Sequence, residues 1–101
     1  MNLLKDISKQ IGSDFQDNAD KAFDLVEMYL AKQKQEVSRV LRCVIYLSKG
    51  DLKTLKEMIN IAQTDYRDAI FWAEYIDLEE NEPKQVRDFS KPFGSNELNN
   101  S

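Results

Sequence analysis

The sequence has 101 residues and contains no histidine. This absence excludes Ser-His-Asp and Cys-His catalytic systems, as well as zinc and di-iron sites that need imidazole ligands. A single cysteine, Cys43, cannot form an internal disulfide or a zinc site built from thiolates alone. The three glycines form neither a Walker A loop nor a dinucleotide-binding loop. We therefore expect a protein that is not an enzyme and that holds no metal or cofactor.

The sequence also lacks long apolar runs. Its first residues include none that could serve as a signal peptide or cross a membrane. A fold with one cysteine does not depend on oxidation, and this is typical of proteins of the reducing cytoplasm. The sequence thus predicts a cytoplasmic protein without membrane contact.

Positive charge is the third scarce feature. The formal net charge is −4, and residues 66–101 carry eight acidic and four basic side chains. No segment has the basic excess of a protein that binds phosphate backbones, which argues against nucleic acid as a partner. A basic stripe with one aromatic residue follows one side of the third expected helix, and we interpret it as a solvated face or a partner surface. It consists of Arg39, Arg42, Tyr46 and Lys49.

Only two prolines and three glycines interrupt the chain, which favours an all-α fold over a β-sandwich. Apolar residues at helical spacing predict a first helix that ends at Gly12 and a second that opens at Ser13 or Asp14. A third helix is expected over residues 36–48. We favour a break near residues 32–36, although the apolar spacing also fits one continuous rod from the second helix into the third.

Two further helices follow. Gly50 ends the third helix and Asp51 is placed to cap the fourth, which carries apolar residues up to position 62. Thr64 or Asp65 then starts a fifth helix, which is apolar or aromatic at most positions from 69 to 76. A helix that is apolar on most sides is normally central, so we expect the fifth helix between its neighbours. The predicted fold is a compact bundle of four or five short helices with an extended C-terminal arm.

The character of the chain changes after residue 76. We divide it into a single helical domain (1–82), an arm packed on that domain (83–93) and a disordered tail (94–101), with an acidic linker ahead of Pro83. Phe89 and Phe93 stand out in the polar arm, because a phenyl ring left in water forgoes roughly 1.5–3 kcal/mol of burial energy. The arm is expected to fold back so that its rings fill a groove between helices; the alternative is docking on another subunit.

Polar residues gather around the fifth helix. Asp65 and Asp68 suit the positive end of a helix, and Arg67 can pair with one of them or bind an anion. Glu74 lies among apolar residues, so it is the carboxylate we most expect to be buried, and a buried carboxylate needs a cation or donors. Arg67 is two turns earlier on the same side, so both could face one groove. The candidate binding residues are Asp65, Tyr66, Arg67, Asp68, Trp72, Glu74, Arg87 and Phe89. They form either a site or a structural clasp.

Several short runs resemble a family of small, uncharacterised all-α bacterial proteins. They are Arg39-Val40-Leu41-Arg42-Cys43, Lys49-Gly50-Asp51-Leu52, Asp65-Tyr66-Arg67-Asp68, Trp72-Ala73-Glu74-Tyr75, Arg87-Asp88-Phe89 and Pro92-Phe93. The resemblance covers about half of the chain, from Arg39 to Phe93. The family has no assigned activity, so the resemblance implies no mechanism. It implies only that these runs belong to one compact unit.

The missing catalytic groups and the surplus of aromatic residues favour a non-enzymatic protein that binds another protein, which can be a second copy of itself. The alternative is a protein that binds a small molecule or an anion in a groove near Tyr66, Arg67 and Glu74, beside Trp72.

Overall fold

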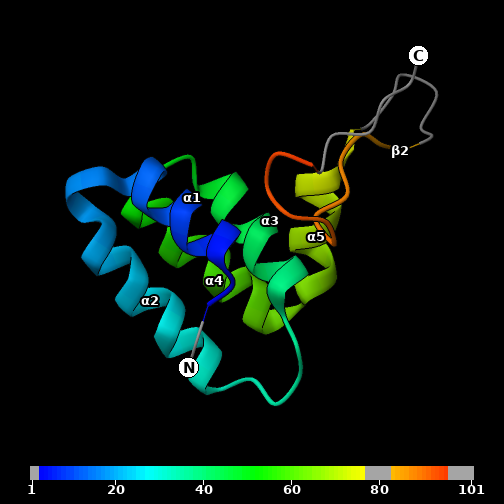
Figure 1. The fold of residues 1–101 in the computed structure, drawn as a ribbon. Coiled ribbons are helices and arrows are strands. Elements are labelled where there is room, and N and C mark those ends of the chain that lie inside the picture. The colour runs from blue at the N-terminus through cyan, green and yellow to red at the C-terminus, as the bar shows by residue number, and fades with distance from the viewer. Residues whose placement is uncertain (1–2, 77–82, 96–101) are drawn as a thin grey trace.

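A computed structural model of the chain describes residues 3–76 and 83–95. Within these residues it confirms the predicted all-α bundle (Figure 1). Its five α-helices are α1 (Lys5–Phe15), α2 (Ala19–Ala31), α3 (Ser38–Ser48), α4 (Leu52–Thr64) and α5 (Tyr66–Glu74). A 3₁₀ turn, η1 (Gln16–Asn18), joins α1 to α2, and two short strands, β1 (Tyr75–Ile76) and β2 (Lys84–Gln85), follow α5.

The first helix continues through Gly12, so the prediction that it ends there is wrong. Ile7, Ile11 and Phe15 follow one another at four-residue steps, and all three are buried. A glycine inside a helix costs about 1 kcal/mol relative to alanine. Burying the ring of Phe15 gains roughly 1.5–3 kcal/mol, so extending the helix by one turn is favourable.

The second helix consequently starts later than predicted. Ser13 and Asp14 belong to α1, and α2 begins only at Ala19, after the 3₁₀ turn. The predicted break between the second and third helices is confirmed, because α2 ends at Ala31 and α3 begins at Ser38. Five of the six intervening residues, 32–36, are polar, and only the last, Val37, packs against the core.

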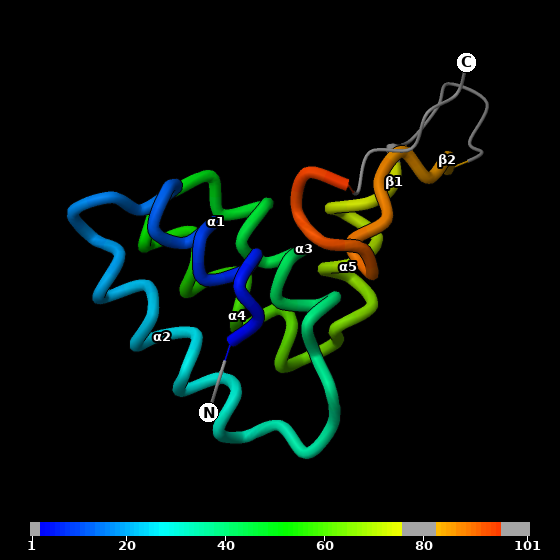
Figure 2. Tube along the Cα trace, in the orientation of Figure 1, coloured from blue at the N-terminus to red at the C-terminus, as the bar shows by residue number. Residues whose placement is uncertain are grey.

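The central helix is α3, which packs against α1, α4 and α5 (Figures 1 and 2). Seven of its eleven residues are buried. These are Val40, Leu41, Arg42, Cys43, Val44, Ile45 and Ser48. The prediction that α5 is central is therefore wrong. The buried side of α5 is made of Ala69, Ala73 and Glu74, whereas its aromatic residues Tyr66, Phe71 and Trp72 are about half exposed.

The turn between α3 and α4 depends on its glycine. Lys49 and Gly50 both have left-handed backbone angles, with φ of 50° and 77°. A Cβ atom on Gly50 would collide with the backbone carbonyl oxygen of Asp14, at the end of α1. Asp51 caps α4 as predicted, because its carboxylate accepts a hydrogen bond from the Thr54 N–H. The turn therefore both reverses the chain and packs against α1.

The chain after α5 does not continue as a helix. β1 pairs with β2 in antiparallel register, with Tyr75 opposite Gln85 and Ile76 opposite Lys84. The arm then crosses from α5 towards α1 (Figure 2). Phe89 is buried to 1% exposure, and Phe93 is half-buried. Most of the predicted acidic linker (residues 77–82) and most of the predicted tail (residues 96–101) lie outside the described residues.

Phe89 contributes to a second core beside the main one, where it packs with Cys43 and Ala73. We predict that Phe89→Ala lowers the free energy of unfolding by about 3–5 kcal/mol, the usual cost of deleting a buried phenyl ring. Phe71→Ala, which removes a ring that is 43% exposed, should cost about 1 kcal/mol or less. Urea unfolding of both variants measures the difference. Equal losses would show that the arm does not complete the core.

Candidate functional site

Glu74 is the last residue of α5, and its side chain is fully buried. This confirms the expectation that it is a buried carboxylate. Such a group is stable in a protein interior only if hydrogen bonds and a cation replace the water it has lost. Its partners therefore determine what this part of the molecule does.

The cation is Arg39, from the first turn of α3. Its Nε donates to Oε2 of Glu74 at 2.8 Å and its Nη2 donates to Oε1 at 2.6 Å. This is the two-point geometry in which an arginine binds a carboxylate most strongly. The hydrogen bond with Glu74 raises the pKa of Arg39, so the guanidinium remains charged.

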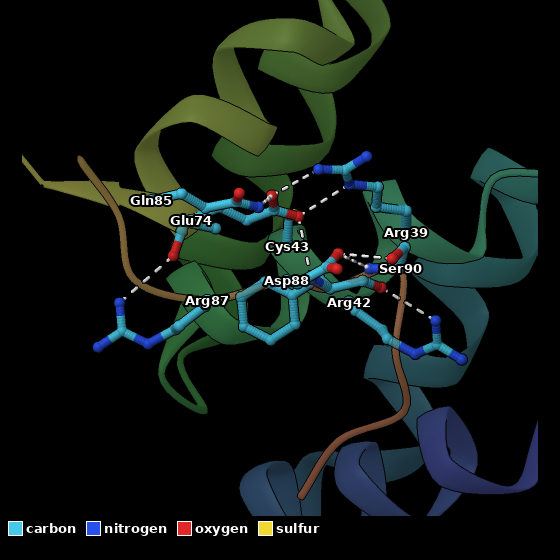
Figure 3. Close-up of polar contacts among 10 residues, drawn as sticks. Arg39, Arg42, Cys43, Glu74, Gln85, Arg87, Asp88 and Ser90 are labelled. Carbon is cyan, nitrogen blue, oxygen red and sulfur yellow. Dashed lines mark hydrogen bonds and ion pairs between the residues drawn. The ribbon is translucent and has the colours of Figure 1, made fainter. Parts of the chain in front are cut away.

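Two further donors to Glu74 come from the arm (Figure 3), and the thiol of Cys43 on α3 also donates to Oε2, at 3.8 Å. Gln85 donates its side-chain amide to Oε1 at 2.9 Å, and the backbone N–H of Phe89 donates to Oε2 at 3.0 Å. The backbone carbonyl of Glu74 accepts the N–H groups of Val86 at 2.7 Å and Arg87 at 3.2 Å. One residue of α5 thus holds the arm through both its side chain and its main chain.

A second ion pair holds the far end of the arm. Arg42 is 3% exposed and donates to both oxygens of Asp6 in α1, at 2.8 Å and 3.1 Å. The third donor of Arg42, Nη1, reaches the carbonyl oxygen of Phe89 at 3.0 Å, and Asp6 also accepts the N–H of Phe93 at 3.1 Å. The hydrogen bond from Arg42 lowers the pKa of Asp6, which keeps the carboxylate ionised.

Two members of the basic stripe of α3, Arg42 and Tyr46, lie under the arm, so for them the interpretation as a solvated face is wrong, whereas Lys49 is exposed and the Arg39 side chain is 41% exposed. Tyr46 packs against the ring of Phe89 at a centroid distance of 5.2 Å. The guanidinium carbon of Arg87 and the Nζ of Lys49 lie 4.6 Å and 4.8 Å from the centroid of the Tyr46 ring. Both are cation–π distances, but only Arg87 belongs to the arm, so the stripe holds the arm through the Arg42 hydrogen bond and the Tyr46 ring.

Cys43 lies beneath this cluster. It is fully buried. Burial raises the pKa of the thiol, and the carboxylate of Glu74 nearby acts in the same direction. A neutral, enclosed thiol is a poor nucleophile, so the environment of Cys43 is that of a core residue.

The structure divides the candidate residues into two groups. Glu74, Arg87 and Phe89 lie together in the cluster that holds the arm, where Nη1 of Arg87 also approaches the carbonyl oxygen of Ala73 at 3.4 Å. The expectation that Arg67 and Glu74 share a groove is wrong, because Arg67 is paired with Asp65 instead.

The second group lies at the start and on the outside of α5. Asp65 caps α5 as predicted and accepts from the backbone N–H of Arg67 at 3.0 Å. The same carboxylate accepts from the Arg67 guanidinium, at 3.0 Å and 3.1 Å, on a surface where Arg67 is 76% exposed. Tyr66, Asp68 and Trp72 are exposed. That any residue of this group binds a partner or a ligand stays a prediction.

Sequence reasoning missed Arg39, Arg42, Asp6 and Gln85 as parts of this cluster. The apolar surroundings of Glu74 did indicate that it needed a cation. They could not indicate which one, because Arg39 lies 35 positions away in the chain. The one available signal was that Arg39 and Arg42 are on the same side of α3 as Tyr46, next to its apolar side.

Two of the hollows in the described surface lie near the candidate residues of α5. A cleft of about 780 Å³ opens where the end of α2, the start of α3 and the α4–α5 turn meet, and it includes Tyr66 and Arg67. A groove of about 420 Å³ runs beside α5 and is lined by Arg67, Ile70, Phe71, Tyr75 and Pro83. Neither hollow includes Glu74, so the most deeply buried carboxylate is not part of an open site.

Within the described part of the chain, no three cysteine, aspartate or glutamate side chains lie close enough to hold a metal ion. None of the described helices has the length and apolar character needed to cross a membrane. Comparisons with protein-family models, with curated proteins and with solved structures found no match to this chain. The resemblance to a bacterial family therefore stays a prediction.

The two arginine–carboxylate pairs of α5 provide a matched test. Glu74→Gln leaves Arg39 without its anion and places an amide NH₂ among donors. Breaking a buried pair costs about 3–5 kcal/mol, and because the Arg39 side chain is 41% exposed we expect the lower end, about 3 kcal/mol. Arg67→Ala breaks a pair at the surface, where solvent screens the charges, so it should leave the free energy of unfolding nearly unchanged. Chemical denaturation of both variants measures this contrast, and a neutral Glu74→Gln would contradict it.

Proposed function

We propose that this chain is a non-enzymatic cytoplasmic protein that acts by binding another protein. The observation that carries the proposal is the outer side of α5. Phe71 and Trp72 are 43% and 50% exposed, and Phe71 stacks on Tyr75 with parallel rings 5.4 Å apart. We call Phe71, Trp72 and Tyr75 the α5 aromatic face. The groove beside α5 adjoins it.

Exposed aromatic clusters are uncommon on proteins that work alone. A large aromatic ring left in water forgoes the energy of burial, and aromatic residues dominate the centres of protein interfaces. The packing of α5 leaves these rings outside, because Ala69, Ala73 and Glu74 occupy the positions that face the bundle. An interface on this face would bury rings that the fold itself leaves outside.

The described residues give less support to nucleic-acid binding and to catalysis. Arg39 and Arg42, which a nucleic acid would need, are already paired with Glu74 and Asp6. The described residues also bring no catalytic triad together, since the chain has no histidine and Cys43 is buried. Protein binding through the α5 aromatic face is the function that these observations favour.

The experiment uses the only tryptophan as a reporter. In light scattering after size exclusion, we expect the full chain to self-associate as its concentration rises or to form a stoichiometric complex with a captured protein. The emission of Trp72 should shift to the blue on association, because the ring leaves water. Phe71→Ser and Trp72→Ser should each weaken the association about tenfold or more, as expected for central interface rings.

Met28 provides the matched control, because it is an apolar residue that is 62% exposed on α2, away from α5. Met28→Ser should leave the association unchanged. A chain that stays monomeric at every concentration and retains no partner would contradict the proposal. Equal effects of Met28→Ser and Trp72→Ser would contradict the assignment of the face.

A further inference from the structure

The cleft between the α2–α3 loop and the α4–α5 turn is not explained by protein binding at the α5 aromatic face. It has a volume of about 780 Å³, which suits a small organic molecule. Its walls come from three separate stretches of the chain. They are Tyr29, residues 32–37 with Val40, and residues 62–67.

The most informative group in the cleft is the Tyr29 side chain. Tyr29 is only 3% exposed, yet its hydroxyl forms no hydrogen bond with any described residue. The hydroxyl is not among the buried polar atoms that lack a partner, so it is accessible at the cleft, where it can donate a hydrogen bond to a ligand. Burial raises the pKa of Tyr29, so the group remains a neutral donor.

Positive charge surrounds this donor. Lys32 and Lys34 are exposed at the cleft, and neither forms an ion pair within the described residues. Arg67 also lines the cleft. Of the two acids present, Asp65 is paired with Arg67, and Glu36 accepts the backbone N–H of Ser38 at 2.6 Å. Both carboxylates therefore already accept a hydrogen bond from a neighbouring residue, whereas neither lysine has an ion-pair partner among the described residues.

The walls of the cleft are partly apolar. Val37, Val40 and Ala62 line it, and the exposed ring of Tyr66 stands at its edge. A ligand that complemented all the walls of the cleft would carry an anionic group to pair with the lysines and accept a hydrogen bond from the tyrosine hydroxyl. It would also carry an apolar or aromatic group for the valines and the Tyr66 ring.

We propose that this cleft binds a small organic anion, a carboxylate or phosphate ester attached to an apolar or aromatic group, with Tyr29, Lys32 and Lys34 holding the anion. The site agrees with the sequence-based alternative in using Tyr66 and Arg67. It differs in excluding Glu74, which is buried and paired with Arg39. The proposal is independent of the α5 aromatic face, because Phe71 and Trp72 do not line the cleft.

The test is a nuclear magnetic resonance titration of the ¹⁵N-labelled full chain with phenyl phosphate, benzoate and inorganic phosphate. We expect saturable shifts confined to the amides of residues 29–40 and 62–67. At least one aromatic anion should bind ten times more tightly than inorganic phosphate, and the tighter of the two identifies the anionic group. Scattered or unsaturable shifts with both aromatic anions would overturn the proposal. Equal binding of inorganic phosphate would overturn it too.

Three variants locate the site. Tyr29→Phe should leave the unfolding transition unchanged, since the hydroxyl has no partner among the described residues. It should weaken the binding of phenyl phosphate or benzoate about fivefold, as expected for one lost hydrogen bond. The double variant Lys32→Ser/Lys34→Ser should weaken it about tenfold or more. Lys5→Ser/Lys9→Ser, which removes the same charge from α1, should not. Equal effects of the two double variants would overturn the site and indicate only a general attraction for anions.

Discussion

The ion pair between Glu74 and Arg39 is the interaction on which the rest of this structure depends. A carboxylate with no exposed surface needs hydrogen-bond donors in place of water, and five hydrogen bonds from Arg39, Cys43, Gln85 and Phe89 meet that need. Two of the donating residues belong to the arm and two to α3. Burying the end of α5 therefore requires the arm to be in place. The arm in turn buries Phe89 against Cys43 and Ala73.

This arrangement also decides which surfaces remain available. Part of the basic stripe of α3 is occupied by the arm, because Arg42 contacts both Asp6 and the Phe89 carbonyl and Tyr46 packs on the Phe89 ring. Two other regions carry side chains that the packing of the bundle leaves exposed or without a hydrogen-bond partner among the described residues. The α5 aromatic face presents rings to water, and the cleft presents an unpartnered hydroxyl beside two lysines that form no ion pair with any described residue. Both proposals follow from this division.

Helical periodicity predicted much of the fold. The caps at Asp51 and Asp65, the break after α2 and the burial of Glu74 all depend on nearby residues, which a sequence displays directly. The wrong predictions arose where tertiary packing outweighed a local preference. Gly12 is a common helix end, but the burial of Phe15 outweighs its cost. The apolar character of α5 suggested a central helix, but the alanines at 69 and 73 set the buried side. The choice of Arg39 as the partner of Glu74 joins residues 35 positions apart, and no local pattern contains it.

The most direct measurement is native-state hydrogen exchange of the Phe89 amide, whose N–H donates to the Glu74 carboxylate. If that carboxylate holds the arm as part of the fold, the Phe89 amide should exchange as slowly as Val44 in α3, through global unfolding. Ser90 is the control, because its amide is bonded only to the neighbouring Asp88 at an exposed position. Exchange of Phe89 as fast as that of Ser90 would show that the arm detaches by itself, and it would contradict this account.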